Sequence, residues 1–246
     1  MKKYGLIGFP LTHSFSRAWF TKKFETEHIT DSVYENFSIP QIEDLEEILQ
    51  KEKDLCGLNV TIPYKEQVMD YLDLQDEVVA AIGACNCIRI QKGILTGHNT
   101  DVVGFESSLK KKLAAHHKAA LVLGSGGASK AVIFVLKKLG MDYRIVSRKP
   151  ATDGLHISYT DLTEELMQSN TLLINTTPLG MYPETGTCPP IPFEFISSRH
   201  YLYDLVYNPA QTIFLQKGKQ KGATIENGSD MLVIQAEESW RIWNES

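Results

Sequence analysis

The stretch LVLGSGGASKAVIFVLKKLG, residues 121–140, says most about the fold of this chain. An apolar strand, Ala119–Leu123, leads into its glycines, and a helix over Lys130–Leu139 follows and is ended by Gly140. A second apolar strand is expected at Tyr143–Val146. A strand, a helix and a strand in this order predict a parallel sheet with a right-handed crossover.

The turn after the first strand fits the G-x-G-x-x-G/A pattern of dinucleotide-binding sites. The residues of this turn are Gly124, Ser125, Gly126, Gly127, Ala128 and Ser129. Gly124 allows a tight turn, Gly126 leaves room for a pyrophosphate beside the backbone, and the small Ser129 lets helix and strand pack closely. Backbone N–H groups at the helix start would bind the phosphates. The alternative is a glycine-rich turn that binds no ligand.

Basic residues at the end of the second strand favour NADP over NAD. The strand runs into Ser147, Arg148 and Lys149, where an acidic residue would bind the ribose 2′-hydroxyl of NAD. Residues 143–152 contain no carboxylate, and arginine can bind a 2′-phosphate through two hydrogen bonds. The alternative is that both cations are solvated surface residues.

The rest of the chain alternates between short strands and amphipathic helices. Strands are expected at Tyr4–Gly8, Val33–Ile39, Leu55–Thr61, Thr171–Asn175 and Tyr201–Leu205, with a hairpin over Ala84–Thr96. Helices are expected after a cap at Ser16 and over Pro40–Glu52, Asp101–Ala115 and Asp230–Trp243. We therefore predict an α/β protein with two domains and a cleft between them.

The break between these domains is expected near residue 101. Residues 1–100, completed by the helix 230–246, would form an N-terminal α/β domain. Residues 101–229 would form a C-terminal, Rossmann-type, doubly wound parallel sheet.

Composition excludes several classes of protein. The 246 residues are 43% hydrophobic, which is too many for a disordered chain, and 25 basic against 30 acidic residues give a net charge of −5. This charge offers no basic surface for nucleic acid. We find no signal-peptide core near the N-terminus and no apolar run of the roughly 18 residues that a membrane span needs. The four cysteines lack zinc-ligand spacing, so we expect a cytoplasmic protein without a metal.

Two charged residues are candidates for proton transfer. Lys65 is expected in the first turn of a helix begun by Pro63, where the helix dipole disfavours a cation and would lower its pKa. The alternative is an exposed lysine that tolerates this position. Asp101, in the segment GHNTD at the proposed domain border, is on its own an ordinary, favourable carboxylate at a helix start.

Polar residues near strand and helix ends are candidates for substrate binding. Asn59, Asn86 and Asn99 lie near strand ends, and each is also compatible with a turn residue that satisfies the backbone. Ser14 and Ser16 lie around a helix start and could bind a carboxylate or simply cap the helix. Gln235 interrupts an apolar helix and points either to a buried partner or into the cleft.

Nine segments together closely resemble the shikimate dehydrogenase family over nearly the whole chain. They are GFPLTHSFS, GLNVTIPYKE, GACN, GHNTDVVGF, LGSGGAS, SRK, INTTPLGM, LYDLVYNP and NGSDMLVIQA. The resemblance implies an N-terminal substrate domain and a C-terminal NADP-binding domain. It implies the reversible, NADPH-dependent reduction of 3-dehydroshikimate to shikimate, in aromatic amino-acid biosynthesis, by a monomer or homodimer.

The resemblance also implies a role for each matching residue. Lys65 and Asp101 would be the catalytic pair that handles the proton of the substrate hydroxyl. The implied substrate-binding residues are Ser14, Ser16 and Tyr207 for the carboxylate, with Asn59, Thr61, Asn86 and Gln235. The implied cofactor-binding residues are Gly124–Ser129, Ser147, Arg148, Lys149, Thr176, Val206, Gly228 and Met231.

The chain departs from the family pattern at two places. Ser147-Arg148-Lys149 replaces the usual Asn-Arg-Thr, and Asp230 places an acidic residue near the expected nicotinamide end. Three alternatives remain: a sister enzyme that acts on quinate or a related hydroxy acid with relaxed use of NAD and NADP, a nucleotide-binding regulator without turnover, and an unrelated Rossmann reductase. Intact Lys65 and Asp101 argue against the regulator, and the N-terminal segments argue against the unrelated reductase.

Overall fold

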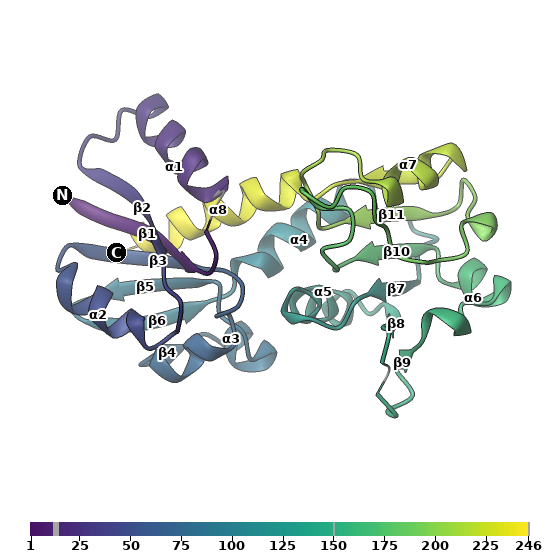
Figure 1. Cartoon of the computed structure of the whole chain (residues 1–246), viewed down its shortest axis with the longest axis horizontal. Coiled ribbons are helices and arrows are strands. Elements are labelled where there is room, and N and C mark those ends of the chain that lie inside the picture. Colours follow the sequence, from purple (N-terminus) through teal and green to yellow (C-terminus); the bar gives the residue numbers. More distant parts are fainter. Residues whose placement is uncertain (12–14, 150, 246) are drawn as a thin grey trace. The chain divides into compact units, whose positions relative to one another are not determined.

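The computed structural model of the chain describes residues 1–11, 15–149 and 151–245. The chain divides into two compact units, Met1–Val103 with Val233–Ser246, and Gly104–Leu232 (Figure 1). It passes from one unit to the other inside two helices, α4 (Thr100–Lys110) and α8 (Ser229–Asn244). Each unit has its own sheet and its own hydrophobic core.

The sheet of the first unit is mixed and has the order β2-β1-β3-β5-β6-β4. Its strands are β1 (Lys2–Gly8), β2 (Ser32–Ser38), β3 (Leu55–Val60), β4 (Leu74–Gln75), β5 (Cys87–Gln91) and β6 (Ile94–His98). β1 pairs in parallel with β2 and β3, whereas β5 runs antiparallel to β3 and β6. The hairpin β5–β6 turns at Lys92 and Gly93, both with positive φ, as the two central residues of a type I′ turn require.

Helices cover both faces of this sheet (Figure 1). They are α1 (Phe15–Thr26), α2 (Asp44–Lys51), α3 (Glu77–Ile82) and the second half of α8. Leu6 packs in one core cluster with Phe20 of α1 and Trp243 of α8. Its neighbour Ile7 packs in the other cluster with Leu45 of α2. Successive side chains of a strand point to opposite faces, so β1 contributes to both cores.

The sheet of the second unit is parallel throughout and has the order β12-β11-β10-β7-β8-β9. Its strands are β7 (Ala119–Leu123), β8 (Asp142–Val146), β9 (His156–Ile157), β10 (Leu172–Asn175), β11 (Tyr201–Asp204) and β12 (Thr224–Glu226). Counted from β7, this is the 3-2-1-4-5-6 order of the Rossmann fold. The predicted doubly wound parallel sheet is confirmed, and its order reverses between β7 and β10.

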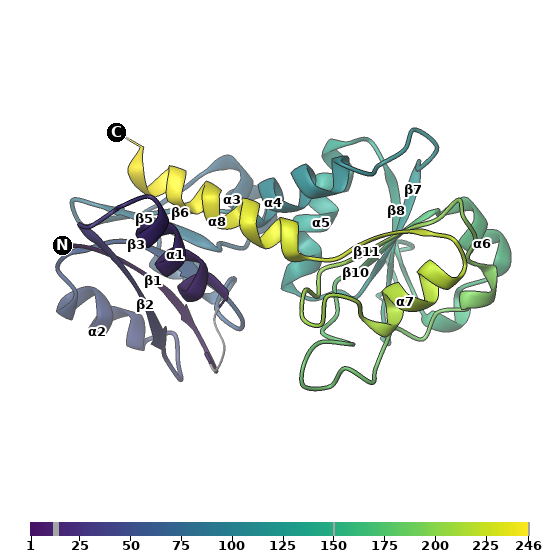
Figure 2. The ribbon, with the colours of Figure 1, turned by 90° about the horizontal axis from the view of Figure 1, so that it is seen from above.

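Helices also cover both faces of the second sheet (Figure 2). They are α5 (Gly127–Lys138), α6 (Glu164–Ser169) and α7 (Ile213–Gln220). Leu121 and Leu123 of β7 pack with Met167 of α6 and Phe214 of α7. Helix α5 packs against β7 and β8, and Figure 2 shows it on the face away from α6 and α7.

Three expected features of the helices are wrong. Helix α1 begins at Phe15, so Ser16 is a helical residue and not its N-cap. Pro63 does not begin an α-helix, because residues 62–66 form turns and a 3₁₀ helix follows at Gln67–Tyr71. Helix α5 begins at Gly127 and not at Lys130, which places the last glycine of the turn inside the helix.

The other differences concern length and short elements. Helix α4 ends at Lys110, five residues before the expected end, and α2 begins four residues after Pro40. The sequence reading did not predict α3, α6, α7 or the short strands β4, β9 and β12. Within the described residues, none of the helices has both the length and the apolar character to cross a bilayer. The same residues contain no group of three or more His, Cys, Asp and Glu arranged to hold a metal.

Candidate active site

The first unit brings Lys65 and Asp101 together. Lys65 lies in the turn after β3, and Asp101 lies in the first turn of α4. The Lys65 ammonium donates a hydrogen bond to Asp101 Oδ2 over 2.6 Å, and the two side chains are only 20% and 14% exposed. Lys65 therefore lies in a turn and not in the first turn of the expected α-helix, and an acidic partner stabilises its charge.

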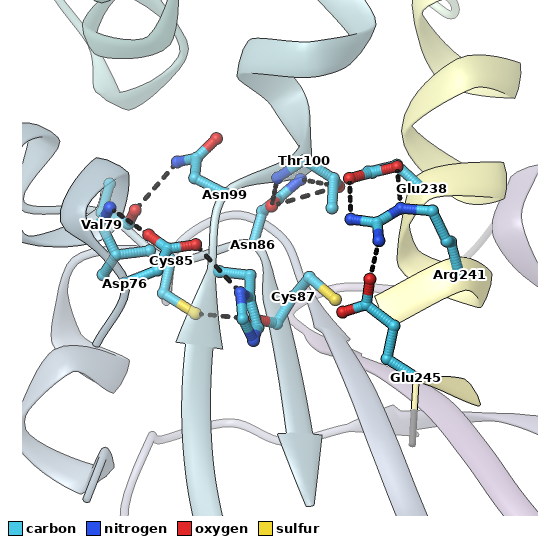
Figure 3. A network of polar contacts seen from close by, with 12 residues as sticks. Asp76, Val79, Cys85, Asn86, Cys87, Asn99, Thr100, Glu238, Arg241 and Glu245 are labelled. Atoms are coloured by element: carbon cyan, nitrogen blue, oxygen red, sulfur yellow. Dashed lines mark hydrogen bonds and ion pairs between the residues drawn. The ribbon is translucent and has the colours of Figure 1, made fainter. Parts of the chain in front are cut away.

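Backbone contacts hold both partners of this pair in place. The carbonyl of Lys65 accepts a hydrogen bond from the N–H of Cys85, just before β5. At the start of α4, the N–H of Thr100 donates to Asn86 Oδ1 over 2.7 Å. Figure 3 shows Asn86 beside Thr100, joined to it by several hydrogen bonds. Asn86 thus provides the helix-capping contact of α4 from the bend directly before β5.

Asn59 is a buried residue with a crowded hydrogen-bond environment. Its Oδ1 accepts from the hydroxyl of Tyr34 over 2.8 Å. Its Nδ2 donates to Ser239 Oγ over 2.9 Å and to the carbonyl oxygen of Asn86 over 3.3 Å. The side chain therefore has internal partners, and one oxygen lone pair is left for any ligand.

Gln235 and Ser239 reach the same network from α8. Thr100 Oγ1 lies 3.3 Å from Gln235 Oε1 and 3.3 Å from Ser239 Oγ. Sequence reasoning singled out Gln235 but missed Thr100 and Ser239. Two signals were available: Thr100 precedes Asp101 directly, and Ser239 follows Gln235 by four residues, which places both on one face of a helix.

The other residues of the first unit that the sequence offered as candidates for substrate binding are Ser14, Ser16, Thr61 and Asn99. Ser14 lies outside the described residues. Ser16 is half-buried and forms a hydrogen bond with Tyr34, whose pKa burial raises well above its usual value. Thr61 follows β3 and donates its backbone N–H to Ile7. Asn99 donates to the carbonyl of Ala84, and its buried Oδ1 has no partner among the described residues (Figure 3).

The second unit places the glycine-rich turn where its sheet order reverses. Gly124 has φ +110°, and a Cβ there would lie 2.8 Å from Thr176 Oγ1. Thr176 follows β10 and donates both its N–H and its hydroxyl to the carbonyl of Leu123, over 2.9 Å each. The two strand ends thus meet at the switch point, where open α/β sheets bind their ligands.

The start of α5 suits a phosphate group. Gly126 is the N-cap, and a Cβ on it would meet nothing within 4 Å, so the backbone there is open to a ligand. Gly127 and Ala128 lie in the first turn, where N–H groups have no partner within the helix. Ser129 is buried and donates its hydroxyl to the carbonyl of Gly126 over 2.6 Å. These features fit the pyrophosphate of a dinucleotide.

The end of β8 presents the expected basic residues. Arg148 and Lys149 are exposed, and neither forms an ion pair within the described part of the chain. Ser147 is buried, and its hydroxyl has no hydrogen-bond partner among the same residues. Two free cations beside an unsatisfied hydroxyl fit a 2′-phosphate group.

Three further residues expected near the cofactor lie in the second unit. Gly228 donates its N–H to the carbonyl of Val206, and a Cβ on it would lie 2.2 Å from the carbonyl oxygen of Leu205. Only glycine fits this close approach. Met231 is buried in the first turn of α8. Asp230 pairs with Lys111 over 2.7 Å, and this ion pair gives the unexplained acidic residue a partner.

The fold and these sites define the class of the protein. It has a Rossmann-type dinucleotide-binding unit and a second α/β unit that carries a lysine–aspartate pair. Residues 6–88 match the model of the shikimate dehydrogenase substrate binding domain. A shikimate dehydrogenase (NADP(+)) from Caldanaerobacter subterraneus subsp. tengcongensis is 37% identical over 259 aligned positions, which cover 98% of this chain and 91% of the relative. The chain belongs to the shikimate dehydrogenase family.

Solved structures agree with this assignment. Shikimate 5-dehydrogenase from Thermus thermophilus, in complex with NADP(H) and shikimate, is 31% identical with a TM-score of 0.87, covering 99% of this chain and 94% of that one. Quinate dehydrogenase from Corynebacterium glutamicum, in complex with NAD, is 25% identical with a TM-score of 0.88, covering 99% and 93%. The predicted fold class is therefore confirmed along the whole chain.

Proposed function

We propose that this protein catalyses the reversible reduction of 3-dehydroshikimate to shikimate by NADPH, a step in aromatic amino-acid biosynthesis. Relatives at 37% identity over almost the full chain carry the name shikimate dehydrogenase (NADP(+)). The observation that carries the proposal is the half-buried ion pair of Lys65 and Asp101, because a dehydrogenase needs a group that gives or takes the hydroxyl proton.

The pair handles the proton in this account. NADPH, when bound, supplies the hydride to the substrate carbonyl carbon. The Lys65 ammonium gives its proton to the oxygen that becomes the hydroxyl, and takes it back in the reverse direction. Asp101, 2.6 Å away, orients the ammonium and stabilises its charge.

Polar side chains of the first unit would bind the substrate. Ser14 and Ser16 would bind the carboxylate, and Asn59, Thr61, Asn86 and Gln235 would bind the hydroxyls and carboxylate. Tyr207 of the second unit would assist at the carboxylate. Burial raises the pKa of Tyr207, so its phenol stays protonated and able to donate at neutral pH. Donors and acceptors of this kind reject analogues strongly, because a missing partner leaves a buried group unpaired.

The second unit would bind NADP. Residues 124–129 would hold the pyrophosphate, and Ser147, Arg148 and Lys149 would surround the 2′-phosphate. Thr176, Val206, Gly228 and Met231 would complete the site. We propose residues 1–100 with 230–246 as the substrate domain and 101–229 as the NADP domain. A cytoplasmic location and a monomeric or homodimeric state stay predictions.

The test compares Lys65→Ala with Lys3→Ala. Lys3 pairs with Glu52 over 2.6 Å at 22% and 28% exposure, so it forms an ion pair of similar geometry elsewhere in the first unit. Lys65→Ala is expected to lower kcat for shikimate oxidation by about 10²–10⁴-fold, the usual size of an acid–base contribution, with little change in KM. Lys3→Ala is expected to keep kcat within about twofold, because Lys3 pairs with Glu52 and has no part in the proposed site. An unchanged kcat in Lys65→Ala would remove Lys65 from the mechanism.

A further inference from the structure

Ser239 connects α8 to the polar residues of the first unit, and sequence reasoning gave it no role. Its side chain is fully buried. Its Oγ donates to the carbonyl of Gln235 over 2.9 Å and lies 2.9 Å from Asn59 Nδ2 and 3.3 Å from Thr100 Oγ1. We propose that Ser239 is a positioning residue of the substrate site, which fixes the orientation of the carboxamides that bind substrate. This inference rests on the proposed function.

The hydrogen bonds from Ser239 to Gln235 and from Asn59 to Ser239 fix the orientation of the Asn59 amide. The carbonyl of Gln235 only accepts, so the single hydroxyl hydrogen of Ser239 goes to it. Ser239 must therefore accept from Asn59 Nδ2. The carbonyl of Asn86, on the other side of this amide, also only accepts. The nitrogen of the Asn59 amide is thus fixed by two acceptors, and its oxygen is turned toward the hydroxyl of Tyr34.

This assignment determines what Asn59 can offer to a substrate. Both of its N–H hydrogens are used inside the protein, and one lone pair of Oδ1 accepts from Tyr34. The remaining lone pair can only accept, so Asn59 would bind a substrate hydroxyl as that hydroxyl's acceptor. Ser239 supports this role, because without its oxygen one Asn59 N–H has no acceptor and the amide is held only by Tyr34 and the Asn86 carbonyl.

A second branch runs through Thr100. Asn86 Oδ1 receives the N–H of Thr100, which can only donate, so the oxygen of this amide is also fixed. Asn86 Nδ2 then donates to Thr100 Oγ1 over 3.0 Å. The one hydroxyl hydrogen of Thr100 is left for Gln235 Oε1 or Ser239 Oγ, both 3.3 Å away. Ser239 and Thr100 together thus connect Asn59, Asn86 and Gln235 across three elements of the fold.

The test measures KM values for Ser239→Ala. We expect the KM for shikimate to rise about tenfold, which corresponds to roughly 1.4 kcal/mol and to the loss of one well-oriented hydrogen bond. We expect the KM for NADP⁺ to stay within about twofold, because the proposed cofactor residues belong to the second unit. kcat should change less than about threefold, since the hydrogen bond between Lys65 and Asp101 does not involve Ser239 and stays in place.

Ser108→Ala is the matched control. Ser108 is also fully buried on a helix, and its Oγ donates to the carbonyl four residues earlier, that of Gly104, over 2.8 Å. It belongs to the second unit and contacts the hydroxyl of Tyr203. We expect both variants to lower Tm to a similar extent, and only Ser239→Ala to raise the KM for shikimate. Two variants of Thr100 test the same network if Ser239→Ala does not fold. Thr100→Val should raise the KM for shikimate, whereas Thr100→Ser, which keeps the hydroxyl, should leave it unchanged.

The outcomes separate this inference from the proposed function. If the wild-type enzyme does not oxidise shikimate, the proposed function is wrong and the inference is wrong with it. If the wild type is active but Ser239→Ala lowers only Tm, as Ser108→Ala does, Ser239 is a structural residue and the inference alone is wrong. A tenfold rise in the KM for shikimate in Ser108→Ala would contradict it equally, because general destabilisation would then explain the effect.

Discussion

Replacing Arg148 by methionine tests the basis of cofactor choice. Arg148 is exposed at the end of β8 and forms no ion pair with any described residue, so its removal should leave the free energy of unfolding nearly unchanged. A charge-assisted hydrogen bond from arginine to a phosphate contributes about 1.5–3 kcal/mol. At about 1.4 kcal/mol per tenfold change, the KM for NADP⁺ should therefore rise roughly 10–150-fold.

The assay follows nicotinamide reduction at varied NADP⁺ and NAD⁺ with saturating shikimate. NAD⁺ lacks the 2′-phosphate, so its KM should not change, and the preference for NADP⁺ should fall by the same factor. Arg199→Met is the matched control. Arg199 is exposed in the same unit but lies before β11, whereas Arg148 follows β8. Because the sheet is parallel, Arg199 lies at the amino ends of the strands and Arg148 at their carboxyl ends. An equal rise in KM for NADP⁺ and for NAD⁺ in Arg148→Met would refute the assignment of the 2′-phosphate to Arg148.

Two further predictions concern glycines and a buried acid. Gly126→Ala should fold with an unchanged Tm, because the new Cβ would meet nothing within 4 Å. It should nevertheless raise the KM for NADP⁺ about tenfold or more, because the Cβ would occupy space proposed for the pyrophosphate. Gly228→Ala should lower Tm, because its Cβ would lie 2.2 Å from the carbonyl oxygen of Leu205. Equal Tm values for the two variants would contradict this. Burial raises the pKa of Asp204 to about 6, above its ordinary value near 3.8. Between about pH 4 and 6 the folded state therefore keeps a proton on Asp204 that the unfolded state has lost. The free energy of unfolding that this proton contributes is lost as the pH rises through this range. Chemical unfolding of the wild type and of Asp204→Asn measures this effect: the free energy of unfolding of the wild type should fall by about 2–3 kcal/mol relative to the variant between pH 4 and 6. The comparison with the variant cancels the opposite contribution of His117, whose pKa burial lowers to about 4. A constant difference between the two proteins would contradict the prediction.

The glycine-rich turn and the strands on either side of it were the most predictable part of the chain, because their signals are local. The strand Ala119–Leu123 has the predicted bounds, and the parallel pairing of β7 with β8 is confirmed. The helix start was placed three residues late, since glycines are poor helix formers and the sequence does not show that Gly127 lies in the first turn. The short helices α6 and α7 carry few turns of periodicity, and they were missed for that reason.

The candidate site was less predictable, because long-range contacts define it. Proline is compatible with a first helical position and with a turn, and at Pro63 the structure has a turn. The partner that explains Lys65 is Asp101, 36 residues further along the chain. The hydrogen bond between Asn59 and Ser239 spans 180 residues, so no local pattern reveals it. The sequence supplied candidate polar residues, and the fold decides which of them meet.

The most direct test of the proposed function is the rise of reduced-nicotinamide absorbance after the purified protein is mixed with shikimate and NADP⁺. Parallel reactions contain quinate in place of shikimate and NAD⁺ in place of NADP⁺. We expect rapid reduction with shikimate and NADP⁺ and much slower reduction in the other pairings. Faster reduction with quinate or NAD⁺ would assign the protein to the sister activity. No reduction in any pairing, with NADP⁺ still bound, would contradict the proposed function and indicate a nucleotide-binding protein without turnover.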